Sequence, residues 1–280
     1  MDAWWFEHVG GIKRVLFVVA FLGAAMWETV RPRQALVLPA GRRWLLQGFF
    51  LVLGTVASAL VFRVSAIVVA SSVADSPYGV LNRDSVPFAL RALLAFLFLD
   101  LVQYADHYLR HAVPLLWRFH QVHHADADLD FSTGLRFHPG DMVFTHGVYL
   151  LAVAAAAPPA SVVFCFEACS VVQALFSHAN ISLPPRVDRA LRLVQVTPQL
   201  HEIHHSRHGA DQRSNLGVVF SFWDRLFRTY RTSSASGESP RPFGLADVTN
   251  DDSLRPWAML ALPFSGPPPP RAATPPSGGR

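Results

Sequence analysis

Four long apolar stretches constrain the fold of this chain more than any other feature of its sequence. They lie at residues 15–30, 44–74, 86–102 and 142–176. A helix needs about 20 apolar residues to cross the hydrocarbon core of a bilayer, and these stretches reach or approach that length. Inside lipid the polar groups of the backbone must bond to each other, which a helix achieves within one segment. The sequence therefore predicts an all-α integral membrane protein.

Composition agrees with a membrane location. The 280-residue chain is 51% hydrophobic and only 16% charged, whereas about 25% of the residues in a typical soluble domain are charged. The sequence pI of about 9.5 could indicate a nucleic-acid partner, but much of the positive charge lies beside the apolar stretches or in a histidine-rich region. We assign this charge to membrane topology and to anionic lipid headgroups, and we expect no nucleic acid to bind.

The last apolar stretch is divided by Pro158 and Pro159. Proline interrupts the hydrogen-bond ladder of a helix, so the two halves are predicted to form a helical hairpin that enters the membrane and returns. Together with the three preceding stretches, this hairpin gives a bundle of about four spans or span-equivalents. The first stretch is followed by no small-residue cleavage pattern, so we expect it to be a retained anchor.

Arginines indicate how the bundle is oriented. The loop after the first stretch carries Arg31, Arg33, Arg42 and Arg43. The loop at residues 75–85 carries a single basic residue, so the positive-inside rule places the first loop in the cytoplasm. Lys13 and Arg14 argue weakly for the opposite orientation. Because the chain has no C-terminal signal for retention in the endoplasmic reticulum, we expect a bacterial inner membrane.

Histidines are concentrated between residues 107 and 205, where one small pattern recurs. H-x-x-H-H occurs as HQVHH and HEIHH, and the related H-x-x-x-H occurs as HYLRH. Side chains at positions i, i+3 and i+4 of a helix lie on one face, so each motif presents its imidazoles in one direction. The histidines of the three motifs are His107, His111, His120, His123, His124, His201, His204 and His205.

This clustering predicts a metal centre in a histidine-rich cytoplasmic cap. A structural zinc site has four ligands and a catalytic one has three plus a water, so eight imidazoles fit two ions with open positions better than one closed site. Imidazole binds Zn, Cu, Fe and Ni, so the ligand type alone does not identify the metal. The predicted hairpin ends at His178, which places a ninth candidate ligand at the same membrane surface.

Two other functions are compatible with the histidine motifs. HEIHH contains H-E-x-x-H, in which His201 and His205 would bind zinc and Glu202 would be the base of a membrane metallopeptidase. HQVHH has the same histidine spacing without a glutamate, so the shared element is H-x-x-H-H. A non-catalytic metal-binding or metal-transport protein is the second alternative, although transport would be expected to place histidines along the membrane spans.

Asp100 lies two helical turns before His107, at the inner end of an apolar stretch. Ionisable residues at that depth are costly and usually functional. A carboxylate there is a candidate acceptor for the second N–H of a ligand histidine, whose tautomer it would fix. The alternative is an interface residue that reaches toward water. Glu28 and Glu167 also lie in apolar stretches, and the sequence shows no partner for either.

The pattern divides the chain into three parts. Residues 1–85 are predicted to form N-terminal membrane helices and loops, and residues 86–232 a catalytic domain that holds the histidine motifs. Residues 233–280 are rich in Ser, Gly and Pro and are predicted to be a flexible tail. Neither G-x-G-x-x-G nor a P-loop motif occurs, so nothing indicates a dinucleotide or ATP domain.

Residues 95–231 resemble the fatty acid hydroxylase/sterol desaturase superfamily. The resemblance is carried by DHYLRH, LLWRFHQVHH, RFHP, FSHANISLP, VTPQLHEIHHS, SNLGVVFSFWDRLF and RTY. It implies an integral membrane enzyme in which the eight motif histidines and His178 hold two iron ions. Two positions depart from the family pattern: Tyr108 stands where the family often has Arg, and Arg228 stands where an FGTY-like segment has Gly.

The resemblance also implies the reaction and its partners. Enzymes of this family use O2 and two electrons to hydroxylate or desaturate a lipid C–H bond. Zinc has no redox chemistry, so iron is the expected metal, although zinc can replace it in purified protein. The chain has no reductase module, so a separate electron donor of the ferredoxin or cytochrome b5 type is expected. The apolar helices imply a lipid substrate without identifying it.

Overall fold

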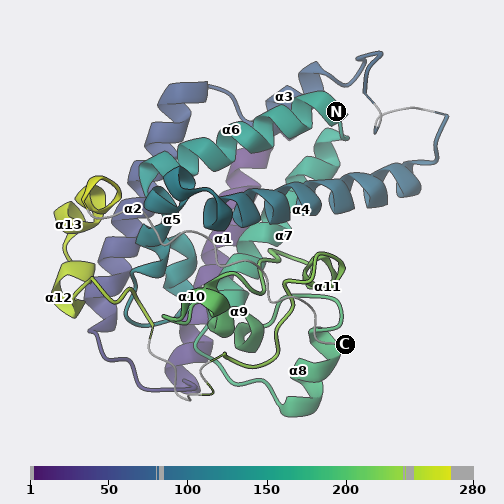
Figure 1. Cartoon of the computed structure of the whole chain (residues 1–280). Coiled ribbons are helices and arrows are strands. Elements are labelled where there is room, and N and C mark those ends of the chain that lie inside the picture. The colour runs from purple at the N-terminus through teal and green to yellow at the C-terminus, as the bar shows by residue number, and fades with distance from the viewer. Residues whose placement is uncertain (1–2, 80, 82–84, 236, 238–242, 266–280) are drawn as a thin grey trace.

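Helices account for all regular secondary structure in the described part of the chain (Figure 1). The computed structural model describes residues 3–265, apart from residues 80, 82–84, 236 and 238–242. The β-bridges within this part are isolated pairs, such as Pro32 with Ile181. The all-α prediction is confirmed.

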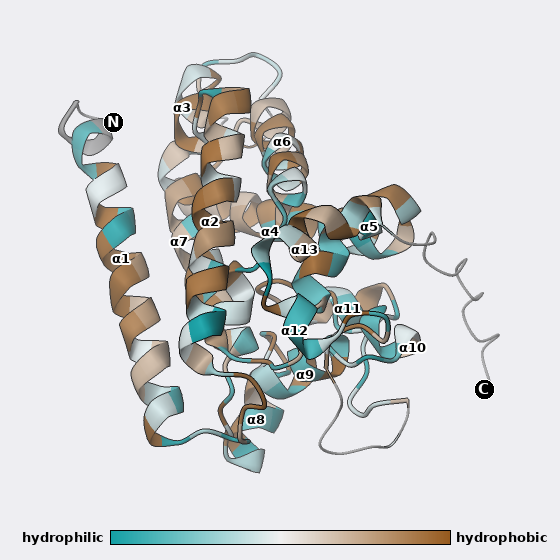
Figure 2. Cartoon of the chain, turned by 90° about the vertical axis from the view of Figure 1, so that its left-hand side faces the viewer, coloured by the Kyte–Doolittle hydropathy of each residue, from teal (hydrophilic) through white to brown (hydrophobic). Residues whose placement is uncertain are grey.

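Four helical segments are long and apolar enough to cross a membrane. They are Glu7–Val30 within α1 (Ala3–Val30), Ala40–Ser72 made of α2 (Ala40–Phe62) and α3 (Ala66–Ser72), α4 (Phe88–Ala112), and α7 (Ala160–His178). Figure 2 shows hydrophobic residues along much of α1 and α2. Val19 and Leu45 are 64% and 79% exposed, as expected for side chains that face lipid. The predicted membrane helical bundle is confirmed at this level.

The predicted break in the last apolar stretch lies between α6 (Pro139–Ala156) and α7. Ala157 adopts a left-handed conformation (φ 48°), and its N–H donates to Val153 O at 2.9 Å, which ends α6. The two following prolines offer no backbone N–H, and α7 begins directly after Pro159. From this turn α6 and α7 diverge (Figure 1).

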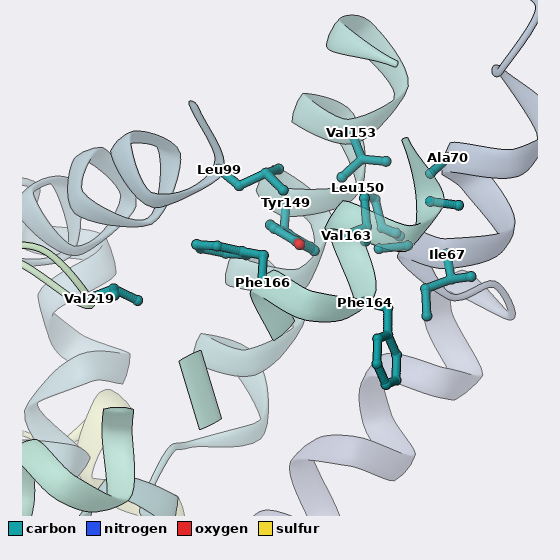
Figure 3. Close-up of a cluster of buried hydrophobic side chains, with 12 residues drawn as sticks. Ile67, Ala70, Leu99, Tyr149, Leu150, Val153, Val163, Phe164, Phe166 and Val219 are labelled. Atoms are coloured by element: carbon teal, nitrogen blue, oxygen red, sulfur yellow. The ribbon is translucent and has the colours of Figure 1, made fainter. Parts of the chain in front are cut away.

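The main apolar core lies where α3, α4, α6 and α7 meet. Figure 3 shows Ile67 of α3, Leu99 of α4, Tyr149 and Val153 of α6, and Phe166 of α7 in this cluster. Leu99, Val153 and Phe166 are each 0% exposed. Full burial of one such side chain contributes about 1.5–3 kcal/mol, so the cluster fixes α4 relative to the α6–α7 turn.

α4 crosses the direction of α1 and α2 rather than running alongside them. It lies across the view in Figure 1 and is foreshortened in Figure 2. Val113 is extended (φ −94°, ψ 117°), as expected for a residue before proline, and it ends the helix. α5 (Pro114–His124) begins at once and packs back against α4. The C-terminal halves of both helices therefore lie close together.

Short elements complete the cap. A 3-10 helix, η1 (Phe131–Leu135), lies between α5 and α6, and Asp130 caps its N-terminus. The helices that follow α7 are α8 (Pro185–Leu191), α9 (Pro198–His204), α10 (Gly209–Gln212) and α11 (Phe222–Leu226). Proline occupies the first helical turn of both α8 and α9, where its missing N–H costs nothing.

Arg43 joins α2 to the loop that follows α5. Its side chain is 0% exposed, donates to Asp126 at 2.8 and 3.0 Å and also pairs with Asp130. Arg33, in the loop between α1 and α2, pairs with Glu202. Both arginines neutralise carboxylates inside the protein. Their pairing weakens the positive-inside argument for the orientation, because that rule concerns basic residues that remain charged in the loops.

The prediction of a flexible tail from residue 233 is wrong for part of that segment. α12 (Asn250–Ser253), α13 (Pro256–Ala261) and the 3-10 helix η2 (Leu262–Phe264) fold against the rest of the molecule. Met259 is 1% exposed and packs in a cluster with Leu46, Phe50 and Val122. The short apolar run at residues 257–262, between Pro256 and Pro263, supplies this contact. The high Ser, Gly and Pro content of the segment as a whole does not reveal it. Residues 266–280 lie outside the described residues.

The two other acidic residues of the apolar stretches have partners that the sequence does not reveal. Glu28 accepts hydrogen bonds from Phe131 N–H at 2.7 Å and from Asn180 N–H at 2.6 Å. Glu167 pairs with Lys13. Glu28 therefore connects α1 to η1 and to the segment after α7, and Glu167 connects α7 to α1.

Candidate metal centre

Nine histidines converge on one region, and their ligand atoms form two sets. They come from α4, α5, α7 and α9, except that His205 directly follows the last residue of α9. Within each set these atoms lie within 4.8 Å of one another. Site A comprises His107, His111, His120, His124 and His204, and site B comprises His123, His178, His201 and His205. Each H-x-x-H-H motif contributes to both sites, so the two sites adjoin. Eight of the histidines are at most 5% exposed, and the partly exposed His111 has a buried Nε2.

Site B brings imidazole nitrogens unusually close together. His178 Nε2 lies 3.2 Å from His123 Nε2, 3.0 Å from His201 Nε2 and 3.2 Å from His205 Nε2. Two nitrogens bound to one metal at about 2.1 Å, with an angle of about 100° between the bonds, are about 3.2 Å apart. The observed spacing is therefore that of ligands around a common ion.

The other ring nitrogens show which atoms carry protons in site B. His123 Nδ1 lies 3.2 Å from Arg136 O, and His178 Nδ1 lies 2.7 Å from Ala174 O. A carbonyl oxygen only accepts, so Nδ1 of each neutral ring carries the proton and Nε2 presents a lone pair. Two lone pairs 3.2 Å apart repel each other. A cation between them would remove that repulsion, which makes site B suited to a metal ion.

Site A shows the same orientation of its ligands. His107 Nδ1 donates to Leu216 O at 2.9 Å, and His204 Nδ1 donates to Ser214 O at 3.0 Å. Several buried nitrogens of this site have no hydrogen-bond partner among the described residues: Nε2 of His111, His120 and His204, and both ring nitrogens of His124. A buried polar atom without a partner costs about 1–3 kcal/mol, and a bound metal would satisfy these nitrogens.

Burial also keeps the histidines of α5 and α9 neutral. It lowers their pKa below the usual 6.5, and neighbouring histidines or, for His120, Arg110 lower it further. The residues concerned are His120, His123, His124, His201, His204 and His205. Neutral imidazole is the form that binds metals, so these histidines are ready to act as ligands at neutral pH.

Asp141 is the carboxylate that contacts a histidine of the cluster. His120 Nδ1 lies 2.9 Å from Asp141 Oδ2. Asp141 also accepts from Arg110 Nη1 at 3.3 Å, and Arg110 Nη2 lies 2.9 Å from Asp106 Oδ2. Sequence reasoning missed Asp141, although its place in the first turn of α6, directly after the RFHP motif, was a usable signal.

Asp100, the candidate acceptor for a ligand histidine, has other hydrogen-bond partners. Asp100 accepts from the backbone N–H groups of Val219 and Phe220 at 3.0 and 3.1 Å, and from Trp223 Nε1 at 2.9 Å. These three bonds hold the loop before α11 against α4. The same stretch of chain includes Leu216, so Asp100 stabilises the segment whose carbonyl orients His107 without touching the histidine.

Glu202, the candidate base of a metallopeptidase, pairs with an arginine. Its carboxylate pairs with Arg33, so it connects α9 to the loop between α1 and α2. His201 and His205, its neighbours in the motif, are grouped with His123 and His178 in site B. In the H-E-x-x-H match, the glutamate therefore forms an ion pair between two segments, and the two histidines belong to site B.

The remaining four histidines lie outside both sets. His138 accepts from Gly140 N–H at 3.0 Å and caps the N-terminus of α6. His146 lies edge-on to Phe62 with ring centroids 5.3 Å apart. His8 and His208 are exposed. The two sets therefore take up all nine histidines predicted to be ligands and none of the others.

Comparison with known proteins identifies the family. Residues 92–229 match the family model for fatty acid hydroxylase. Residues 92–229 form a domain of the fatty acid hydroxylase superfamily. The region that matches this hydroxylase family begins in α4, ends after α11 and contains all nine histidines of sites A and B.

Curated proteins similar to this chain are named as a lipid hydroxylase and as monooxygenases. Ornithine lipid hydroxylase OlsE of Rhizobium tropici is 29% identical over 183 residues, which cover 65% of this chain and 53% of the relative. Alkylglycerol monooxygenase of Danio rerio is 30% identical over 143 residues, and that of Caenorhabditis elegans 28% over 164 residues. These matches cover 50% and 58% of this chain and 30% of either relative. No solved structure matches the chain.

Proposed function

We propose that this chain is a membrane-bound di-iron lipid hydroxylase that uses O2 and electrons from a separate donor. The observation that carries the proposal is the pair of adjoining buried histidine sets within a fatty acid hydroxylase domain. The two sets account for all nine histidines, with the ligand atoms of each set within 4.8 Å of one another. The hydroxylase and monooxygenase relatives favour hydroxylation over desaturation.

The donor set fits iron. Imidazole nitrogens suit several transition metals, and attack on an unactivated C–H bond requires the redox chemistry that iron supplies when bound and that zinc lacks. Site A has five imidazoles and site B four. We assign one ion to each site.

The chain's own residues orient the ligands and keep the site dry. Backbone carbonyls of residues 136, 174, 214 and 216 accept the Nδ1–H of four histidines, so that Nε2 faces the site. These carbonyls fix the tautomer of the four histidines that they contact. The near-complete burial of the cluster excludes water from the place where a lipid C–H bond would be oxidised.

A lipid could approach from the bilayer along α1 and α7. An apolar cavity of about 140 Å³ lies between these helices, lined by residues that include Ala20, Gly23, Trp27 and Leu175. Its lining also includes Ala179, which follows the site B ligand at residue 178 in the sequence. The named substrates of the relatives, an ornithine lipid and alkylglycerols, are polar lipids with long chains. We propose a substrate of that class.

The location of the protein is part of the same proposal. We propose a bacterial inner membrane with the histidine cluster on the cytoplasmic side, where a ferredoxin- or cytochrome b5-type donor would deliver electrons. The catalytic region is residues 86–232, which contains the family match at residues 92–229. Residues 1–85 supply the membrane helices that precede it.

Transfer of oxygen from 18O2 to lipid tests the proposal. Membranes with the iron-loaded protein would receive 18O2, a chemical or enzymatic reductant, and a lipid extract that contains ornithine lipids and alkylglycerols. We expect 18O-labelled hydroxylated lipid with the wild type and none with His204→Ala. A wild-type protein that binds two metals but transfers no label to any lipid would instead support the non-catalytic metal-binding alternative.

A further inference from the structure

We infer that Asp141 is a positioning residue that makes the two metal positions chemically unequal, with site A holding its ion more tightly than site B. The inference rests on the proposal that both histidine sets bind metal. The observation behind it is the 2.9 Å hydrogen bond between His120 Nδ1 and Asp141 Oδ2. Both side chains are almost completely buried.

The partners of the other Nδ1 atoms show why this bond is unusual. In site B, His123 and His178 donate to backbone carbonyls. In site A, His107 and His204 also donate to backbone carbonyls. His120 alone among these five histidines donates to a carboxylate. A carboxylate partner makes an imidazole a stronger metal ligand than a carbonyl does.

The direction of the hydrogen bond follows from the surroundings of His120. Arg110 Nη1 lies 3.1 Å from His120 Nδ1, so Arg110 is an alternative donor to that nitrogen. In that arrangement the His120 proton would be on Nε2, which is buried without a partner among the described residues. With Asp141 as the acceptor, Nε2 is a lone pair that faces site A. Only this second arrangement leaves no buried N–H of the His120 ring unsatisfied.

A buried network keeps Asp141 in place. Arg110 Nη1 donates to Asp141, and Arg110 Nη2 pairs with Asp106, which also accepts from Thr145 Oγ1 at 3.1 Å. Two carboxylates thus share one guanidinium, and with both carboxylates ionised this network carries a net negative charge beside His120. In a buried setting such a charge attracts a divalent cation more strongly than it would in water. Only site A is contacted directly by this network.

Metal release from the full-length protein in detergent tests the inference. Zn²⁺ serves as the probe, because it is redox-silent and binds imidazole. We expect the wild type to release two ions to an excess of chelator in two phases, the slower one from site A. Loss of an outer partner of a metal ligand usually lowers metal affinity by about 10–100-fold. We therefore expect Asp141→Asn to accelerate the slow phase by about that factor and to leave the fast phase unchanged.

Asp188→Asn is the matched control. Asp188 is a buried aspartate that pairs with Arg192 in and after α8, outside both sites. We expect this variant to keep both release phases of the wild type. Asp106→Asn removes a charge from the network without touching His120 and should accelerate the slow phase by a smaller factor. It also provides the test if Asp141→Asn does not fold.

Three results would overturn the inference. Unchanged release from Asp141→Asn would show that the carboxylate does not strengthen site A. Equal acceleration of both phases in Asp141→Asn would show that Asp141 stabilises the fold as a whole and does not strengthen site A in particular. Wild-type protein that binds fewer than two Zn²⁺ ions would remove the two-site proposal itself. The wild-type stoichiometry alone therefore distinguishes failure of the proposed function from failure of this inference.

Discussion

Gly134 leaves no spare space beside His178 and the carbonyl that orients it. A Cβ atom on Gly134 would lie 3.0 Å from Ala174 O and 3.1 Å from His178 Nδ1. Ala174 O is also the acceptor for His178 Nδ1–H, so the extra atom would press on both members of the bond that orients this ligand. η1 and α7 pack directly at this point, and the backbone cannot yield there without cost.

Gly134→Ala should therefore weaken site B selectively. Overpacking of this kind costs about 1–3 kcal/mol, and we expect that loss in thermal unfolding together with loss of the site B ion. Gly41→Ala is the control, because a Cβ there would meet nothing within 4 Å. Wild-type metal content and stability in Gly134→Ala would show that the close packing at His178 is not required.

Contacts within one helix could be predicted from the sequence, whereas contacts between helices could not. The i, i+3, i+4 spacing placed the motif histidines on common helix faces because that spacing is a property of one helix. The carboxylate partner was assigned to Asp100, although Asp141 is the one that contacts a histidine. Asp141 lies on α6 and meets His120 of α5 only through tertiary packing, which spacing along one helix cannot show.

At the scale of elements, α13 connects the C-terminal segment to the helices that carry the site. Met259 packs with Leu46 of α2 and Val122 of α5, and Val122 lies within the HQVHH motif. Arg136 donates to Ser253 O at 2.8 Å and to Val122 O at 2.9 Å, which links the same segment to α5. The segment therefore supports the second histidine motif from outside.

Met259→Ala should destabilise the protein more than its position near the C-terminus suggests. Truncation of a buried methionine costs about 2–5 kcal/mol, whereas Trp257→Ala should cost less than about 0.5 kcal/mol, since Trp257 is 77% exposed. Thermal unfolding of both variants in detergent measures the difference. Equal, small effects would mean that α13 does not stabilise α5.

Composition and periodicity predicted the elements of the bundle unequally well. The break between α6 and α7 follows from two prolines and was predicted because proline acts locally. The folding of α12 and α13 was missed because the short apolar run at residues 257–262 lies in a segment that is otherwise rich in Ser, Gly and Pro. Its partners, Leu46 and Phe50, lie some 200 positions earlier in the chain. A segment that folds only against distant partners has no signal of its own.

At the scale of the whole molecule, folding buries the histidines of four separate segments in one place. The pKa values of the α5 and α9 histidines are lowered in the folded chain, chiefly by burial. Below about pH 6.5 the unfolded chain binds protons at these histidines and the folded chain does not. The free energy of unfolding therefore falls as the pH falls.

The metal-free protein should lose stability steeply between pH 6.5 and pH 5. Each such histidine contributes up to about 1.4 kcal/mol per pH unit while only the unfolded chain is protonated. Thermal unfolding of metal-free protein across this pH range should show the loss, with a shallower slope in His124→Gln. A melting temperature that stays constant over the range would contradict the burial of neutral histidines.

Iron content per chain tests the two-site account most directly. The measurement would compare the wild type, purified from iron-replete cells, with His124→Ala in site A and His205→Ala in site B. The two histidine sets predict about two irons per wild-type chain and the loss of about one in each variant. A single metal ion per chain that survives His124→Ala and is lost in His205→Ala would contradict the account, since it would leave site A without a metal.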